Sequence, residues 1–201
     1  MDKPAFLTAS VTQGDLNAMV KNIMVRMPDT DDPNEVVRRV NSGEWVVNRA
    51  DLLKQVATAN VGGVERFCAK DSLAEANIGS MNDNFKEFFL GKVEESVGAT
   101  TIVVHRLERK SLNTLIMAEL GDRAEIQLAH CFQLLKAQSN GEQGVLLVNG
   151  ASNIVYLLGV DNNLRTVSFQ WHARRGFWDV LAHYIEDRSG VWLADNQIFS
   201  L

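Results

Sequence analysis

The side chains best suited to chemistry lie on two adjacent strand-like runs between Gln170 and His183. Successive residues of a strand point to opposite faces, so Gln170 and His172 share one face of the first run. Asp179 and His183 share a face of the second run for the same reason. If the hairpin register brings these faces together, a carboxylate and two histidines are close enough to bind a metal or to move protons. The alternative, which we favour because the register is not fixed by the sequence, is a polar solvent-facing side of a sheet.

The turn between these two runs is a second candidate, as a binding surface. Arg174 and Arg175 lie in the turn, and Trp171 and Trp178 flank it. Tryptophan and arginine are enriched at binding hot spots, and two guanidinium groups suit an anionic partner. The alternative is that the tryptophans fill the core and the arginines keep the turn soluble. We therefore predict that the hairpin from Trp171 to Asp179 is the functional surface, with this structural alternative left open.

Elsewhere the sequence lacks the local spacings that identify a reaction. No phosphate-loop, CxxC, HExxH or Gly-x-Ser-x-Gly pattern occurs. The two cysteines, Cys68 and Cys131, stand too far apart to supply a structural zinc site, and Cys131 fits a buried thiol in a helix. His130 and Cys131 are neighbours about 100° apart on that helix, so they do not form a nucleophile–base pair. We expect no cofactor, no metal and no disulfide.

Composition narrows the class of protein. The chain has 201 residues, of which 46% are hydrophobic and 22% charged, which is enough to form a globular core. Its net charge of -5 argues against a general affinity for nucleic acid or an anionic membrane. Neither a signal peptide nor an apolar run long enough for a membrane helix is evident. The predicted location is the cytoplasm.

Residues 1–79 are predicted to form a mainly helical region. Apolar residues recur with helical spacing from about residue 12 to 27, and Asp32-Pro33 is a typical start for a second helix. Asn48 is the predicted cap of a third helix, which ends at Gly62-Gly63. A short strand, Val64 to Cys68, follows. The Gly-, Ser- and Asn-rich stretch 77–84 is the predicted linker.

Residues 80–201 are predicted to form an α+β domain. Thr100 to Leu107 is rich in β-branched residues and predicts a strand, and helices are predicted around 85–93, 111–121 and 122–140. Five short apolar or alternating runs follow: 145–148, 154–160, 164–172, 177–185 and 191–199. The connections between them have turn composition and are too short for parallel crossovers. The predicted fold class is therefore α+β, with a helical N-terminal part followed by a helix-covered, five-stranded antiparallel β-meander.

One set of short segments resembles uncharacterised proteins encoded in bacterial genomes. The segments are Gly144-Val145-Leu146-Leu147, Asn153-Ile154-Val155-Tyr156, Trp178-Asp179-Val180 and the closing stretch from Val191-Trp192 to Phe199-Ser200. This resemblance covers the C-terminal part of the chain alone. It implies no function.

The sequence favours a non-enzymatic binding or interaction protein, because no catalytic spacing outweighs its structural alternative. A small enzyme that uses His172, Asp179 and His183 is the first rival. A weak nucleic-acid binder that uses the Arg174-Arg175 hairpin is the second, since bases stack on aromatic side chains beside arginine, although the acidic balance weighs against it. A protein partner fits the first reading; its identity and the oligomeric state are left open.

Overall fold

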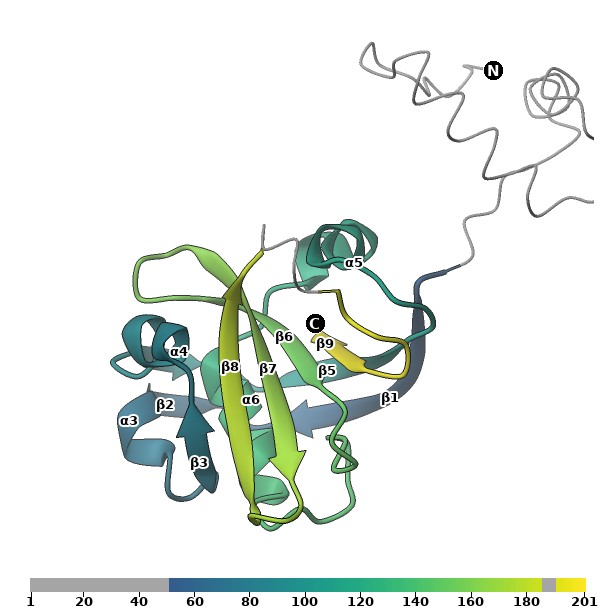
Figure 1. The fold of residues 1–201 in the computed structure, drawn as a ribbon. Helices are drawn as coiled ribbons and strands as arrows, with labels where there is room; N and C mark the ends of the chain where they lie inside the picture. Colours follow the sequence, from purple (N-terminus) through teal and green to yellow (C-terminus); the bar gives the residue numbers. More distant parts are fainter. Residues whose placement is uncertain (1–50, 186–190) are drawn as a thin grey trace, which may run out of the picture. The chain divides into compact units, whose positions relative to one another are not determined.

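Seven strands build one mixed sheet, in the order β1-β5-β9-β6-β7-β8-β3 (Figure 1). A computed structural model describes residues 51–185 and 191–201, so the helices predicted before residue 48 lie outside the described residues. The strands are β1 (Leu53–Val61), β2 (Val64–Cys68), β3 (Ile78–Met81), β4 (Val93–Val97), β5 (Thr100–Leu107), β6 (Asn153–Leu158), β7 (Leu164–His172), β8 (Phe177–Tyr184) and β9 (Gln197–Ser200). The helices are α3 (Ala69–Ser72), α4 (Asp83–Phe88), α5 (Asn113–Leu120) and α6 (Leu128–Ala137), with a 3-10 turn at Gly121–Arg123.

The predicted fold class is wrong, because the sheet was predicted to be antiparallel and is mixed. The strands β6, β7 and β8 form an antiparallel meander, as predicted. However, β9 pairs parallel to β6, and β3 pairs parallel to β8, so the sheet is mixed. Short connections fix the direction of consecutive strands only. Both β3 and β9 reach the sheet through longer segments, for which the turn argument has no force.

The third predicted helix is strand β1. Its apolar residues Leu52, Leu53, Val56 and Ala57 have helical spacing, yet β1 pairs antiparallel with β5. The register shifts between Gln55 and Ala57, which marks a bulge at Val56. A bulge inserts one residue and reverses the alternation of faces. The apolar residues before the bulge therefore face the opposite side of the strand from those after it. Read along the chain, their combined spacing resembles that of a helix.

Two of the five predicted C-terminal strands differ as well. Residues 145–148 form no strand, because side-chain amides take the place of a neighbouring strand. Gln138 accepts a hydrogen bond from Leu146 N (2.8 Å) and donates one to Leu146 O (3.0 Å). Asn153 does the same for Leu147, at 2.8 and 3.0 Å. The run 191–199 contributes only β9 at its end.

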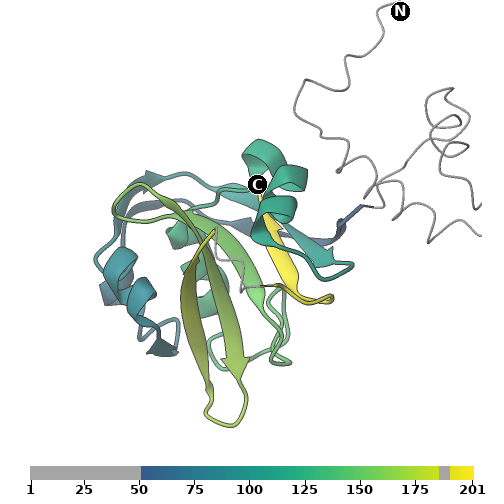
Figure 2. The same cartoon turned by 45° about the horizontal axis from the view of Figure 1, so that its top comes forward.

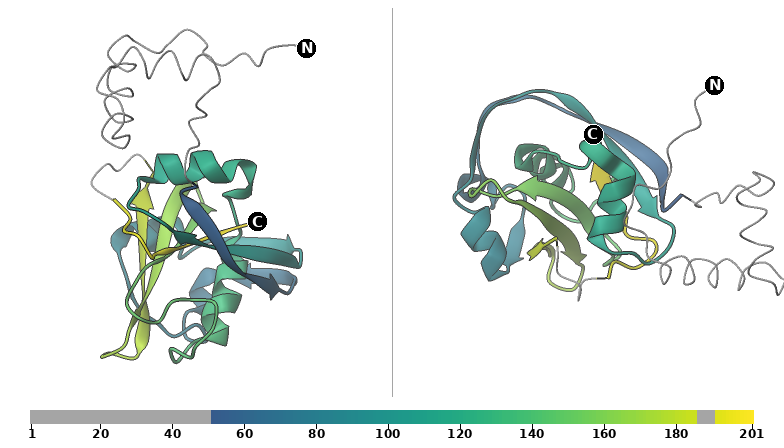
Figure 3. Two further views of the ribbon diagram at one scale, coloured as in Figure 1. Left: turned by 90° about the vertical axis from the view of Figure 1, so that its right-hand side faces the viewer. Right: turned by 90° about the horizontal axis from the view of Figure 1, so that it is seen from above.

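One long, bent ribbon joins the sheet to a smaller one. The pairs Val61–Thr100 and Val64–Val97 continue the same register, so β1 and β2 run alongside β5 and β4 as a single antiparallel ribbon. Figure 3 shows this ribbon arching away from the rest of the sheet. A side chain at Gly63 would place its Cβ 2.9 Å from Val97 O, so the bend requires glycine there.

Helices cover both faces of the seven-stranded sheet. One face packs against α6 through a cluster that includes Phe132, Leu135 and Phe169. The other packs against α5 through Ile116, with Tyr156 and further apolar side chains, and Figures 1 and 2 show α5 beside β9. Helix α6 also contacts β1, β2 and β4, so it lies between the sheet and the bent ribbon.

The structure also bears on the organisation of the chain. Residues 51–201 cluster as one compact unit. The stretch 77–84, predicted as a linker, contains β3, whose partner is β8, and the predicted boundary at residue 79 falls inside this strand. The strand predicted at Thr100–Leu107 is confirmed with the same bounds. Within the described part of the chain, no helix combines the length and apolarity needed to cross a membrane.

Candidate functional site

The register of β7 and β8 places the four polar candidates of the hairpin strands on one face: Gln170, His172, Asp179 and His183. Gln170 is directly opposite Asp179, and His183 is opposite Thr166. Asp179 and His183 are four residues apart along one strand, which separates them by roughly 13 Å. They are thus too far apart to hold one ion. Consistently, no three His, Cys, Asp or Glu side chains of residues 51–185 and 191–201 are arranged to hold a metal.

Some polar groups on this face have hydrogen-bond partners within the part of the chain that the structure describes, and others do not. Gln170 donates from Nε2 to Ser152 Oγ at 2.6 Å. Asp179 Oδ1 is buried and has no hydrogen-bond partner among the described residues. His183 packs edge-on against Trp192, with ring centroids 6.2 Å apart. His172 lies opposite Phe177 at the end of the hairpin. These side chains are spread along the hairpin rather than converging on one point.

The two tryptophans of the hairpin belong to the core. Trp171 is 9% exposed and Trp178 is fully buried, and their rings contact each other edge-on at 5.4 Å. Gly141, with φ of +73°, has the Trp171 indole where a Cβ would stand. The indoles pack against each other and against Gly141 inside the core, so they do not form the contact surface that the hairpin prediction relied on. Arg174 and Arg175 are exposed in the turn.

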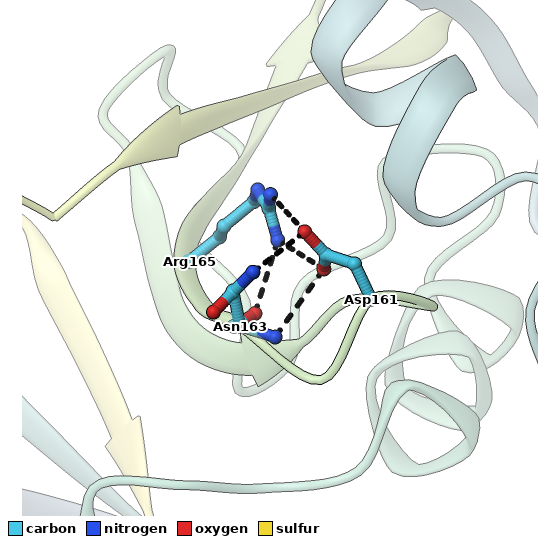
Figure 4. A network of polar contacts seen from close by, with 3 residues as sticks. All are labelled: Asp161, Asn163 and Arg165. Atoms are coloured by element: carbon cyan, nitrogen blue, oxygen red, sulfur yellow. Dashed lines mark hydrogen bonds and ion pairs between the residues drawn. The ribbon is translucent and has the colours of Figure 1, made fainter.

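Arg165 is buried in a network of polar contacts that has a structural role (Figure 4). Arg165 donates from Nη1 and Nη2 to the two carboxylate oxygens of Asp161, at 2.7 and 2.6 Å. Its guanidinium lies 3.5 Å from the centroid of the Phe88 ring. The hydrogen bonds from Arg165 and Asn163 hold the pKa of the Asp161 carboxyl well below its usual range. The network fixes the β6–β7 turn against α4.

A groove lies elsewhere, between β2, the segment that follows it, and α6. We call it the β2–α6 groove; its volume is about 420 Å³. Strand β2 contributes Val64, Arg66, Phe67 and Cys68. The following segment contributes Asp71, Ser72, Glu75 and Ala76. Helix α6 contributes Ala129, Phe132, Gln133 and Lys136, which recur at the spacing of one helical face.

Helix α6 is held in place by the neighbouring strand β4. Glu94 is buried, and its carboxylate accepts hydrogen bonds from Leu128 N (3.1 Å) and Ala129 N (2.8 Å) at the start of the helix. Lys92 Nζ lies 3.1 Å from the same carboxylate. A carboxylate at a helix N-terminus satisfies free amides and complements the helix dipole. Strand β4 thereby fixes the helix that forms one wall of the groove.

The floor of the groove is apolar and its rim is charged. Phe67 and Phe132 are buried below it, with ring centroids 5.0 Å apart. At the rim, Lys136 Nζ contacts Glu75 Oε2 at 2.6 Å. Arg66 is largely exposed and lies 3.9 Å from Glu95. An apolar floor under convergent polar groups is typical of ligand-binding sites.

The two cysteines differ in their access to this groove. Cys68 is half-buried and lines it, whereas Cys131 is buried in α6. Burial raises the pKa of the Cys131 thiol, which suppresses the reactive thiolate. The adjacent His130 bonds Gly98 O through Nε2 at 2.9 Å. The pair is therefore structural, as the helical geometry predicts.

Sequence reasoning did not find this groove. It predicted β2 as a strand, but nothing local shows that α6 would pack beside it. The contact depends on Gln133 and Gly62, which are 71 residues apart. Comparison of the chain with protein-family models, curated proteins and solved structures gives no match.

Proposed function

We propose that the protein is a non-enzymatic binding protein whose ligand occupies the β2–α6 groove. The observation that carries the proposal is the groove itself, which combines an apolar floor of Phe67 and Phe132 with a polar rim. Its volume of about 420 Å³ falls within the range of ordinary ligand pockets. The protein would bind this ligand in the cytoplasm, the location that the sequence favours.

The lining favours binding over catalysis. Cys68 carries the only thiol among the groove's lining residues, and no histidine is among them. A cysteine nucleophile needs a base or a strongly electropositive setting to become reactive. The two acidic lining residues, Asp71 and Glu75, balance the two basic ones, Arg66 and Lys136, so the surroundings of Cys68 are not strongly electropositive. Both observations support a ligand-binding role.

Amide NMR spectra with a small-molecule fragment library test this proposal. We expect some fragments to shift the signals of lining residues such as Ala129 and Gln133. A maleimide adduct on Cys68 should abolish these shifts, because it fills the groove. The matched control is a Cys68→Ser, Lys86→Cys variant, which carries the adduct on exposed α4 and should still bind. Fragments that bind equally well with the groove blocked would refute the proposal.

The exposed hairpin arginines support a second candidate, a contact for an anionic group. Arg174 and Arg175 project from a turn in which Arg175 N and Gly176 N bond His172 O, at 2.9 and 2.8 Å. Paired guanidinium groups bind carboxylates or phosphates well. An Arg174→Ala, Arg175→Ala variant tests this surface. It should leave binding in the groove unchanged and weaken any binding of inorganic phosphate.

A further inference from the structure

The wall of the groove formed by β2 presents backbone groups without partners. Gly62 N donates a hydrogen bond to the side-chain amide of Gln133 at 2.9 Å, and Gly62 O accepts one from it at 2.8 Å. The backbone of Gly62 therefore faces α6. Ala69 N instead bonds Lys92 O, so residue 69 faces β4. The two positions differ by an odd number of residues, as the alternation of an extended strand requires. Even-numbered residues of β2 therefore turn their N–H and C=O toward the groove.

Two of these even-numbered residues are open. Cys68 O accepts a hydrogen bond from Ser72 Oγ at 2.9 Å, and Gly62 is bound by Gln133, so bonded groups flank the stretch on both sides. Between them, Val64 and Arg66 form no hydrogen bond to the described residues on their groove side. Their amides and carbonyls lie roughly 7 Å apart along the strand. That is the spacing at which a neighbouring strand offers its own alternate peptides.

We propose that the β2–α6 groove binds an extended, uncharged peptide segment that adds to β2 as a third strand beside β2 and β4. The inference rests on the proposed function and names the class of ligand. Main-chain hydrogen bonds to Val64 and Arg66 provide affinity, as in other cases of strand addition. A small or medium apolar side chain of the peptide packs on Phe67 and Phe132.

The balanced charges of the rim fit an uncharged occupant. The rim carries two cations, Arg66 and Lys136, and two anions, Asp71 and Glu75. Lys136 and Glu75 already neutralise each other at 2.6 Å. The net charge of the lining is therefore zero, which disfavours a polyanion such as nucleic acid. It suits a neutral stretch of peptide whose polar groups are those of the backbone.

The first experiment is a selection of heptapeptides from a random phage-displayed library on the full chain. The best peptide is then synthesised with single N-methyl groups at each position in turn. N-methylation removes one backbone donor and leaves the side chains intact. We expect alternate positions to lose about tenfold or more in affinity, and the positions between them to lose little. Uniform tolerance of N-methylation would overturn the proposal.

The second experiment changes the edge of the protein. Arg66→Pro removes an N–H that faces the groove and spares the pairing with β4, a placement that edge strands tolerate. It should weaken the peptide about tenfold, whereas the matched Arg66→Ala variant, which keeps the N–H, should stay within about threefold. Unchanged Tm values confirm that both variants fold. Equal affinity of the two variants would contradict strand addition, and the N-methyl series decides the matter if Arg66→Pro does not fold.

The outcomes separate this inference from the proposed function. Fragments that bind in the groove while the library yields no peptide would overturn strand addition and leave the binding function standing. Failure of both would refute both. Self-association of the chain that Arg66→Pro abolishes would show that the edge pairs with a second copy, and would overturn the peptide proposal.

Discussion

Two regions of the molecule treat exposed strand backbone in opposite ways. Where β8 extends beyond β3, Asn82 accepts a hydrogen bond from Ala182 N (3.0 Å) and donates one to Ala182 O (2.9 Å). The segment 145–148 is closed in the same manner by Gln138 and Asn153. At β2, by contrast, Val64 and Arg66 lie between two closed positions and stay open.

This contrast distinguishes edges that are closed for stability from an edge that is available for binding. An open strand edge is a liability, because it pairs readily with other chains. In the part of the chain that the structure describes, side-chain amides close exposed backbone at three places. The outer edge of the ribbon stays open at Thr58 and Asn60 of β1 and at Val64 and Arg66 of β2, and of these four residues Val64 and Arg66 line the groove with the apolar floor. The closed edges should matter for stability and the open edge for binding.

Replacement of Gln138 should have the largest effect on stability. The side chain is 4% exposed and bonds the backbone of both Leu146 and Glu142. In Gln138→Leu, buried backbone groups lose their partners, which should cost about 2–4 kcal/mol of unfolding free energy. Urea unfolding measures this cost, and Gln143→Leu, at an exposed site, is the matched control. A cost equal to that of the control would show that the amide does not close the segment.

Replacement of Asn82 should have the next largest effect. Asn82 bonds Ala182 and also caps α4 through Phe85 N at 3.0 Å. Asn82→Ala should lower the unfolding free energy by about 1–2 kcal/mol. Asn84→Ala is the control, because Asn84 forms a single bond to Ala182 O. If the two variants were equally stable, the closure of β8 by Asn82 would have no energetic basis.

The smallest effect on stability is expected at the groove. Gln133 is half-buried and its bonds to Gly62 are exposed to solvent, so Gln133→Ala should cost about 0.5 kcal/mol or less. The change frees the N–H and C=O of Gly62, next to the open positions Val64 and Arg66. A selected peptide long enough to reach Gly62 should therefore bind about threefold more tightly, as fluorescence anisotropy can measure. Weaker binding would indicate that Gln133 itself contacts the ligand.

The sequence predicted best the elements that depend on local pattern. Thr100–Leu107 was correct because β-branched residues fill it, and β7 and β8 were found from their alternation and their turn. Strand β1 was missed because the bulge at Val56 reverses the phase of its pattern. The run 145–148 has the composition of a strand, yet its partners are the distant side chains of Gln138 and Asn153.

The candidate site was harder to predict than the fold. The sequence left open whether Gln170 and Asp179 share a face, because the register was not fixed. The separation of Asp179 from His183 along β8 follows from simple strand geometry and argues against a common site. The groove depends on backbone groups of Val64 and Arg66, which carry no signature in the residue types. Only the packing of α6 beside β2 reveals it.

Amide hydrogen exchange, followed residue by residue in NMR spectra, measures whether the edge of β2 is open in the free protein. We expect the amides of Val64 and Arg66 to exchange rapidly, whereas those of Phe67 and Ala69, which face β4, are protected. Addition of the selected peptide should then protect Val64 and Arg66. Slow exchange at Val64 and Arg66 in the free protein, matching that of Phe67, would show that the edge is already closed and would contradict the account.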